Sequence, residues 1–170
     1  MADGLLADST APAGQREPVT AVALGAAAVD MMDDIARRAG IRLRLCAVAP
    51  AMLTVNYAQL LRVLGNVIGN AVKYSPAGSE VCLAGTSREG GRFVWTVADQ
   101  GHGMSAADLA NVWTQGWQGA AGLARGDGAG LGLAIVERIV KEHGGSVSID
   151  SAPGRGTSVA LELPCTGCLP

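Results

Sequence analysis

The stretch LRVLGNVIGNAVKYS at residues 61–75 decides the fold, because its spacing predicts a helix with two different faces. At about 100° per residue, one stripe of this helix collects polar side chains: Gln59, Arg62, Asn66, Asn70 and Lys73. The opposite side collects apolar ones: Leu60, Leu64, Val67, Ile68, Ala71 and Val72. We therefore expect a helix over about 57–73 that packs by its apolar side and leaves the polar stripe open.

Two glycines, Gly65 and Gly69, lie beside the asparagines of this stripe. Each glycine costs a helix about 1 kcal/mol relative to alanine, so their presence needs a reason. A face that only meets solvent usually carries Glu and Lys, whereas this one carries Asn66 and Asn70. The pattern favours the close approach of a bound group, and the side-chain oxygen of Asn70 is a type of ligand that Mg²⁺ accepts.

Two glycine motifs follow downstream. Asp99, Gly101 and Gly103 stand at the end of a predicted strand, a pattern that by itself is more typical of a turn with an Asx hydrogen bond. The run GDGAGLG at 126–132 leads directly into a predicted helix, and glycine-rich helix N-termini bind phosphate through backbone N–H groups. Neither the strand of a dinucleotide fingerprint nor the lysine of a P-loop accompanies this run.

The rest of the chain alternates between helical and strand periodicity. We expect helices at about 19–39 and 131–143, with a short one starting at Ser105. Val22, Val29, Met32 and Ile35 are the apolar candidates of the first helix. Strands are expected at 41–47, 81–86, 93–98, 146–152 and 157–163, the last four as two hairpins. This order predicts a two-layer α/β sandwich, with a mixed, mostly antiparallel sheet and the helices on one face.

Composition limits the alternatives. The chain has 170 residues, 49% of them hydrophobic, which predicts one folded domain over about 19–164 between a flexible linker at 1–18 and a tail at 165–170. A net charge of −2 disfavours nucleic acid, and the lack of a long apolar run or leader predicts a cytoplasmic chain without membrane contact. Four cysteines are expected to be reduced thiols, the last two without zinc: Cys46, Cys82, Cys165 and Cys168.

Four motifs in this order resemble one family. The stretch at 61–75, DQGHG at 99–103, GDGAGLGLAIV at 126–136 and GRGT at 154–157 resemble the ATP-binding catalytic domain of sensor histidine kinases, in the GHKL superfamily with its Bergerat fold. The resemblance implies a kinase of two-component phosphorelay signalling that binds ATP with Mg²⁺. It would donate the γ-phosphoryl group to a histidine on a separate dimerisation domain, upstream of a response regulator receiver domain. Whether the parent protein is membrane-anchored stays open.

The resemblance also implies roles for individual residues. Asn70 corresponds to the Mg²⁺ ligand, Asn66 to the position where related hydrolases carry a glutamate base, and Lys73 to a phosphate contact, the three forming the catalytic set. Tyr74 would pack near the adenine, and Asp99 would accept a hydrogen bond from the exocyclic amino group of adenine. The other implied ATP-binding positions are Gly101, Gly103, Met104, Arg125, Gly128, Gly130, Leu131, Gly132, Leu133 and Thr157.

This sequence departs from the family's pattern mainly between 104 and 129, where the family has its ATP lid. Trp113 and Trp117 replace a phenylalanine pair, Ala129 a frequent threonine, and Arg125 stands in for a lid arginine. Asn56 replaces an aspartate before the helix at 57–73. The Gly- and Ala-rich composition predicts a lid that is mobile without nucleotide and orders over the phosphates when ATP binds.

Other functions remain open. An anti-sigma-type serine kinase or an ATPase would use the same pocket, although both often carry an acidic residue at the position of Asn66. A non-catalytic module for nucleotide binding or partner docking is the alternative of a different class. His102 and His143 are not in the setting of a phosphorylated histidine, so we expect both to be structural or solvated.

Overall fold

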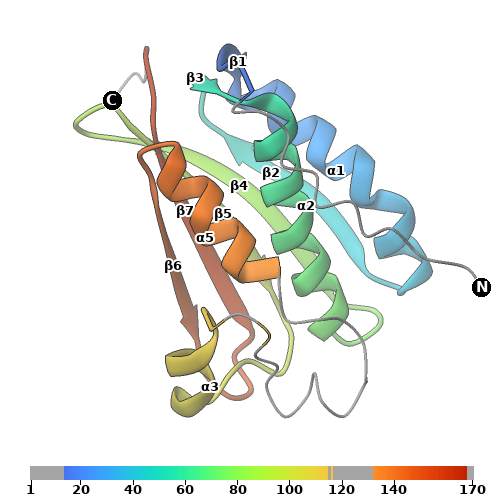
Figure 1. The fold of residues 1–170 in the computed structure, drawn as a ribbon. Helices are drawn as coiled ribbons and strands as arrows, with labels where there is room; N and C mark the ends of the chain where they lie inside the picture. The colour runs from blue at the N-terminus through green and yellow to red at the C-terminus, as the bar shows by residue number, and fades with distance from the viewer. Residues whose placement is uncertain (1–13, 115, 117–131, 168–170) are drawn as a thin grey trace, which may run out of the picture.

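The computed structural model describes residues 14–114, 116 and 132–167. Its main sheet has five strands in the order β2-β4-β5-β7-β6, and three helices, α1, α2 and α5, lie on one face of it (Figure 1). The strands are β2 (Arg42–Val48), β4 (Glu80–Arg88), β5 (Arg92–Asp99), β6 (Ser146–Ser151) and β7 (Thr157–Pro164). The helices are α1 (Ala21–Arg38), α2 (Tyr57–Tyr74) and α5 (Gly132–Glu142).

The predicted α/β sandwich is confirmed. Strands β4 and β5, and strands β6 and β7, form the two expected antiparallel hairpins. Only β2 runs parallel to its neighbour, β4, among the strand pairs of this sheet that the structure describes. The short helix α3 (Ala106–Asn111) begins where expected, because the Ser105 side chain accepts a hydrogen bond from the Asp108 backbone in a capping box.

The domain boundaries differ from the expectation. A second, small sheet pairs β1 (Glu17–Thr20) with β3 (Met52–Val55), so regular structure starts within the segment expected to be a linker. At the other end, Thr166 forms an isolated bridge with Met52, which ties part of the expected tail to the body. Residues 1–13 and 168–170 lie outside the described part of the chain.

The expectation of reduced thiols is wrong for the three cysteines that the structure describes. Cys46 on β2 and Cys82 on β4 form a disulfide whose Cα atoms are 6.0 Å apart. The two residues are separated by 36 positions in sequence, so only the pairing of β2 with β4 brings them together. Cys165 is disulfide-bonded as well.

Helix α1 confirms two of its four predicted apolar residues, since Met32 is buried and Val29 packs against the core. The other two, Val22 and Ile35, are 48% and 53% exposed, whereas Leu24, Ala28 and Ala36 are fully buried. Small residues on the buried face let the helix lie close to the sheet. Gly25 shows how close: a Cβ atom there would lie 2.8 Å from the ring of Trp95.

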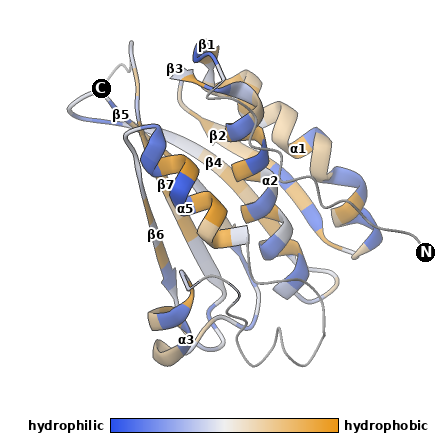
Figure 2. Cartoon of the chain, viewed as in Figure 1, coloured by the Kyte–Doolittle hydropathy of each residue, from blue (hydrophilic) through white to orange (hydrophobic). Residues whose placement is uncertain are grey.

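Helix α2 packs as predicted, with all six of its predicted apolar residues buried. In Figure 2 polar and apolar residues alternate along α2 and α5, as expected of helices with one face on the core. The glycines of α2 have a structural reason: a Cβ at Gly65 would lie 2.6 Å from the Met31 side chain, and one at Gly69 would lie 3.5 Å from Met32. The group that approaches these glycines is therefore helix α1, not a ligand.

His143 joins two helices at the end of the molecule opposite to Asn70. It is 5% exposed, its Nε2 accepts a hydrogen bond from the Asn56 backbone at 3.1 Å, and its Nδ1 donates to the Ile139 carbonyl at 2.8 Å. Asn56 is the N-cap of α2, so His143 holds the start of α2 against the end of α5. The expected structural role of His143 is thus confirmed. No helix in the described part of the chain is long and apolar enough to span a bilayer.

Burial lowers the pKa of His143, while the hydrogen bond to Ile139 opposes that shift. The folded protein therefore holds a neutral imidazole, and the unfolded chain takes up a proton first as the pH falls below the ordinary histidine pKa of about 6.5. We predict that the free energy of unfolding falls as the pH drops below about 6.5, by up to about 1.4 kcal/mol per pH unit from this group. Urea unfolding at several pH values measures it.

His143→Gln is the control, because glutamine does not titrate and its side-chain oxygen can still accept a hydrogen bond. The difference in unfolding free energy between wild type and H143Q is expected to shrink as the pH falls, since only the wild type is destabilised through this side chain. A difference that stayed constant from pH 7.5 to about 5 would contradict the assignment.

Candidate functional site

Asp99, the last residue of β5, is held by the backbone on two sides. Its Oδ1 accepts hydrogen bonds from the N–H of Gly101 at 2.8 Å and from the N–H of Thr157 at 3.1 Å. Burial raises the pKa of the Asp99 carboxyl, and the two N–H groups lower it in opposition. In the described part of the chain no group donates to Oδ2, so one carboxylate oxygen is clamped and the other is open.

The glycines around Asp99 allow backbone segments to meet. A Cβ at Gly101 would lie 2.6 Å from the Tyr74 carbonyl oxygen. A Cβ at Gly103 would overlap the Ala152 carbonyl, and one at Gly156 would overlap the carbonyl of Asp99 itself. The resemblance suggested that Gly101 and Gly103 let the backbone pass a bound base. In the structure both make room for the protein's own backbone, which links the end of α2, the loop after β5 and the β6–β7 turn.

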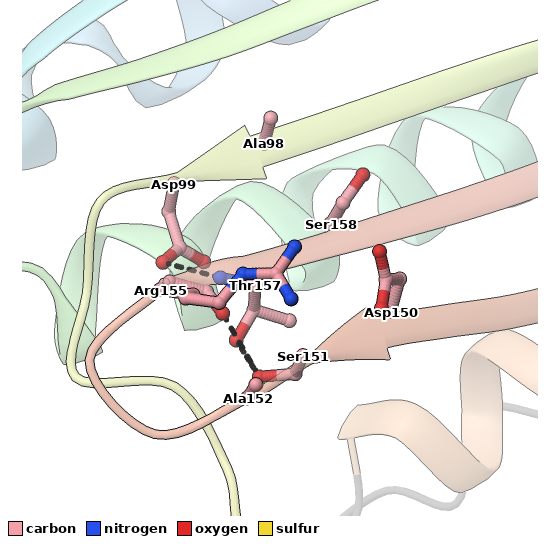
Figure 3. A pocket seen from close by; sticks show the side chains of 9 residues that line it. Ala98, Asp99, Asp150, Ser151, Ala152, Arg155, Thr157 and Ser158 are labelled. Atoms are coloured by element: carbon pink, nitrogen blue, oxygen red, sulfur yellow. Dashed lines mark hydrogen bonds between the residues drawn. The ribbon is translucent and has the colours of Figure 1, made fainter.

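Ser151 is a part of this site that the sequence analysis missed. Its Oγ donates to the Gly156 carbonyl at 3.0 Å and accepts from the Met104 N–H at 2.9 Å. The Thr157 hydroxyl, 2.9 Å away, is therefore the donor in the pair that these two hydroxyls form. Thr157 meets Asp99 through its backbone N–H rather than its hydroxyl (Figure 3). The register of the β6–β7 hairpin could have indicated this role, because Ser151 pairs directly with Thr157.

The polar stripe of α2 faces the start of α5. Asn66, Asn70 and Lys73 are all half-buried, and the Asn70 amide nitrogen would lie 3.8 Å from a Cβ at Gly132, the first residue of α5. Within the residues that the structure describes, the amides of Asn66 and Asn70 make no hydrogen bond. Asn70 therefore lies beside the N-terminal end of α5 with no hydrogen-bond partner among the described residues.

Tyr74 closes the α2 end of the site. Its ring makes a T-shaped contact with His102, with centroids 5.6 Å apart, and the ammonium group of Lys73 lies 5.3 Å from the ring centre. His102 is exposed and its carbonyl accepts from the Gly154 N–H at 2.8 Å, which joins the motif at 99–103 to the motif at 154–157. Three of the four sequence motifs are thus brought together at one end of the sheet.

A metal at this site would depend on few protein ligands. In the described ranges no cluster of three His, Cys, Asp or Glu side chains could hold an ion. The Asn70 side chain offers one neutral oxygen, which fits Mg²⁺ when phosphate and water complete its coordination. The residues present therefore fit a magnesium ion that arrives with a phosphorylated ligand.

Several predicted positions lie outside the described residues: Trp117, Arg125, Gly128, Ala129, Gly130 and Leu131. The predicted mobility of the lid falls mostly on these residues and stays a prediction. In the first part of the lid, the Met104 backbone N–H donates a hydrogen bond to the Ser151 hydroxyl, and Trp113 is half-buried. Leu133, at the start of α5, is half-buried too.

A cavity of about 230 Å³ is lined by Asp99, Ser151 and Thr157, and by no residue of α2. Ala98 and Ser158 line it too and pair with each other, while their neighbours Val97 and Val159 are buried under the helices. Because successive strand residues point to opposite faces, the cavity extends at the end of the sheet to the face that the helices leave uncovered. Figure 3 shows Asp150 and Arg155 at its rim.

Known proteins match this chain across its folded part. Residues 55–167 match the family described as histidine kinase-, DNA gyrase B- and HSP90-like ATPase. The virulence sensor protein BvgS of Bordetella bronchiseptica is 35% identical over 151 residues, which cover 85% of this chain and 12% of that protein. The sensor-like histidine kinase SenX3 of Mycobacterium tuberculosis is 37% identical over 119 residues, covering 68% of this chain and 29% of that protein.

Solved structures match as well. The mycobacterial sensor histidine kinase MprB superposes with a TM-score of 0.76 at 28% identity, over 88% of this chain and 97% of that one. Full-length ShkA in complex with AMPPNP superposes with a TM-score of 0.79 at 30% identity, over 91% of this chain and 32% of that one. The chain thus spans less than a third of the length of the curated relatives named above.

The backbone contact at Gly103 yields a prediction with a matched control. Gly103 and Gly154 both have positive φ, at 70° and 76°, but nothing lies within 4 Å of a Cβ at Gly154. Gly154→Ala is expected to cost only the conformational penalty of about 1–2 kcal/mol. Gly103→Ala adds a backbone clash and is expected to cost about 2–5 kcal/mol in unfolding free energy, as measured by urea denaturation. Equal losses in the two variants would show that the Ala152 contact does not matter.

Proposed function

The chain belongs to the family of histidine kinase-, DNA gyrase B- and HSP90-like ATPases, and from this premise we propose that it is the catalytic domain of a two-component sensor kinase. In this proposal it binds ATP with Mg²⁺ and donates the γ-phosphoryl group to a histidine on a separate dimerisation domain. The phosphoryl group would then pass to the receiver domain of a response regulator.

The open oxygen of Asp99 is the observation that carries the proposal. The exocyclic amino group of adenine is a hydrogen-bond donor, and Oδ2 is an acceptor without a partner in the described residues. The two N–H groups on Oδ1 stop the carboxylate from rotating. The site is therefore organised for adenine before adenine arrives, which lowers the entropy cost of binding.

The phosphates would lie between α2 and the start of α5. Asn70 would supply an oxygen to Mg²⁺ and Lys73 a positive charge, while the N-terminal N–H groups of α5 would face the phosphate oxygens. A bound Mg²⁺ neutralises charge on the transferring phosphoryl group. Arg125, Gly128, Gly130 and Leu131 would add contacts, a role that rests on the resemblance alone.

The chemistry at position 66 favours a histidine as the acceptor. Asn66 cannot remove a proton, so a serine or a water molecule would find no general base there. A neutral imidazole attacks through a nitrogen lone pair and needs none. The new bond forms between that nitrogen and the γ-phosphorus, and the bond to the bridging oxygen breaks to release ADP. His143 is buried and already bonded through both ring nitrogens, so it cannot be the acceptor.

Asp99→Asn tests adenine recognition. If the asparagine oxygen keeps the two N–H bonds of Gly101 and Thr157, its NH₂ group faces the amino group of adenine, and two donors meet. We predict a loss of about 1–3 kcal/mol, or roughly 5- to 150-fold in the affinity for Mg-ATP, by isothermal titration calorimetry. Asp150→Asn is the matched control, because Asp150 is an exposed carboxylate that alternates along β6 with Ser151 and therefore points to the other face of the sheet. Unchanged ATP affinity in D99N would remove Asp99 from the nucleotide site.

Phosphotransfer is tested with a histidine-bearing dimerisation domain supplied as a separate polypeptide. With γ-labelled ATP and Mg²⁺, the label is expected on this partner as an acid-labile, alkali-stable phosphoramidate, and not on a partner whose histidine is replaced by glutamine. Asn70→Ala is expected to abolish the Mg²⁺-dependent transfer, whereas Gln59→Ala, on the same stripe nearer the start of α2, is expected to retain it. ATP binding without transfer would favour the non-catalytic alternative.

A further inference from the structure

The Cys46–Cys82 disulfide lies on the face of the sheet that the helices leave uncovered. Cys82 alternates along β4 with Val81 and Leu83, which are fully buried beneath the helices. Its side chain therefore points to the other face, where it is half-buried. Cys46 is half-buried too, so both sulfur-bearing residues border on solvent.

An irregularity in β2 brings Cys46 to its partner. Leu45 pairs with Leu83, but the next pair is Val48 with Gly85, so two residues of β2 stand where β4 has one. These two residues are Cys46 and Ala47, and neither pairs with a residue of β4. A bulge of this kind changes the direction of a side chain, and here the Cα atoms of the two cysteines come within 6.0 Å, the separation that a disulfide requires.

Positive charge surrounds the Cys82 side of the pair. Arg44 is the direct β2 partner of Cys82, and Arg42 lies two residues before it on the same face of the strand. Both guanidinium groups share a single carboxylate, Glu80, at 3.4 Å and 3.9 Å. The local charge is therefore net positive, which stabilises the thiolate form in which a cysteine attacks a disulfide.

We propose that Cys46 and Cys82 form a reversible thiol–disulfide modification site that reacts with low-molecular-weight disulfides such as oxidised glutathione. The Cys82 thiolate attacks one glutathione sulfur, the S–S bond of glutathione breaks, and one glutathione thiolate leaves. The Cys46 thiolate then attacks the Cys82 sulfur and displaces the second glutathione. Two protein thiols are oxidised, one glutathione disulfide is reduced, and the two protons end on the two glutathione molecules.

The disulfide crosslinks β2 to β4 on the face of the sheet opposite to the proposed nucleotide site. The loop it closes contains β3 and all of α2, with Asn66, Asn70 and Lys73. On the other side of β4, Cys82 pairs with Ala98, the residue before Asp99. Closing a loop of this length removes many conformations from the unfolded chain, so oxidation is expected to stabilise the folded domain. This inference does not depend on the proposed kinase activity.

The test incubates the wild-type chain in glutathione buffers that range from fully reduced to fully oxidised, then traps free thiols with an alkylating reagent. Mass spectrometry of the peptides reports the fraction in which Cys46 is bonded to Cys82. The fraction is expected to rise from below about one tenth to above about nine tenths across this range. A pair that stays reduced in excess oxidised glutathione, or stays crosslinked in fully reduced glutathione, overturns the proposal.

Thermal unfolding supplies a second measurement that needs no variant. The oxidised wild type is expected to melt about 5–10 °C above the reduced one. The shift should vanish in C46S/C82S and persist in the matched control C165S/C168S, which removes the other two cysteines of the chain. A shift that persists in C46S/C82S, or vanishes in C165S/C168S, assigns the redox response to the C-terminal pair and overturns the proposal.

Discussion

One oxygen atom, Oδ1 of Asp99, connects the loop after β5 to the start of β7 at one end of the sheet. It accepts from the N–H of Gly101 on its own strand's exit loop and from the N–H of Thr157 at the start of β7. Both bonds need the backbone to approach closely, which explains why the chain has glycine at 101 and 156, where a Cβ would meet the Tyr74 carbonyl and the Asp99 carbonyl. The glycines that resemble a ligand-binding motif are therefore required for folding. Because both hydrogen bonds go to Oδ1, they leave Oδ2 open.

Helix α2 is held by contacts at both of its ends and in its middle. At its last residue, the Tyr74 carbonyl meets Gly101; at its first turn, the Asn56 N–H is held by His143 from the end of α5. Between these two contacts, Gly65 lets the Met31 side chain of α1 press against the helix. These contacts fix both ends and the middle of α2, so Asn70 is held in place beside Gly132 at the start of α5.

Much of this arrangement could be predicted from the sequence, because it follows from local patterns. The apolar spacing of α2, the turn between β6 and β7 and the Ser105 cap are each specified by residues within one element.

The predictions that failed involve contacts between segments that are distant in sequence. The pairing of β1 with β3 joins residues about 35 positions apart, and strands of four residues are too short to show a period. Two of the four predicted core residues of α1 are exposed, because alanines and a glycine, rather than the larger Val22 and Ile35, meet the sheet. The role of Ser151 needed the hairpin register, which no single strand reveals.

The two faces of the sheet serve different chemistry because of the alternation of side chains along β4 and β5. Val81 and Asp99 are direct partners in the β4–β5 ladder, and so are the next pair, Cys82 and Ala98. One pair therefore faces the helices, where a carboxylate can be desolvated and clamped, and the other faces outward, where a thiol can meet small molecules. A shift of β4 by one residue against β5 would turn Cys82 toward the helices, onto the face that carries Asp99. The register of β4 against β5 therefore keeps the proposed nucleotide site and the proposed redox site on opposite faces of the sheet.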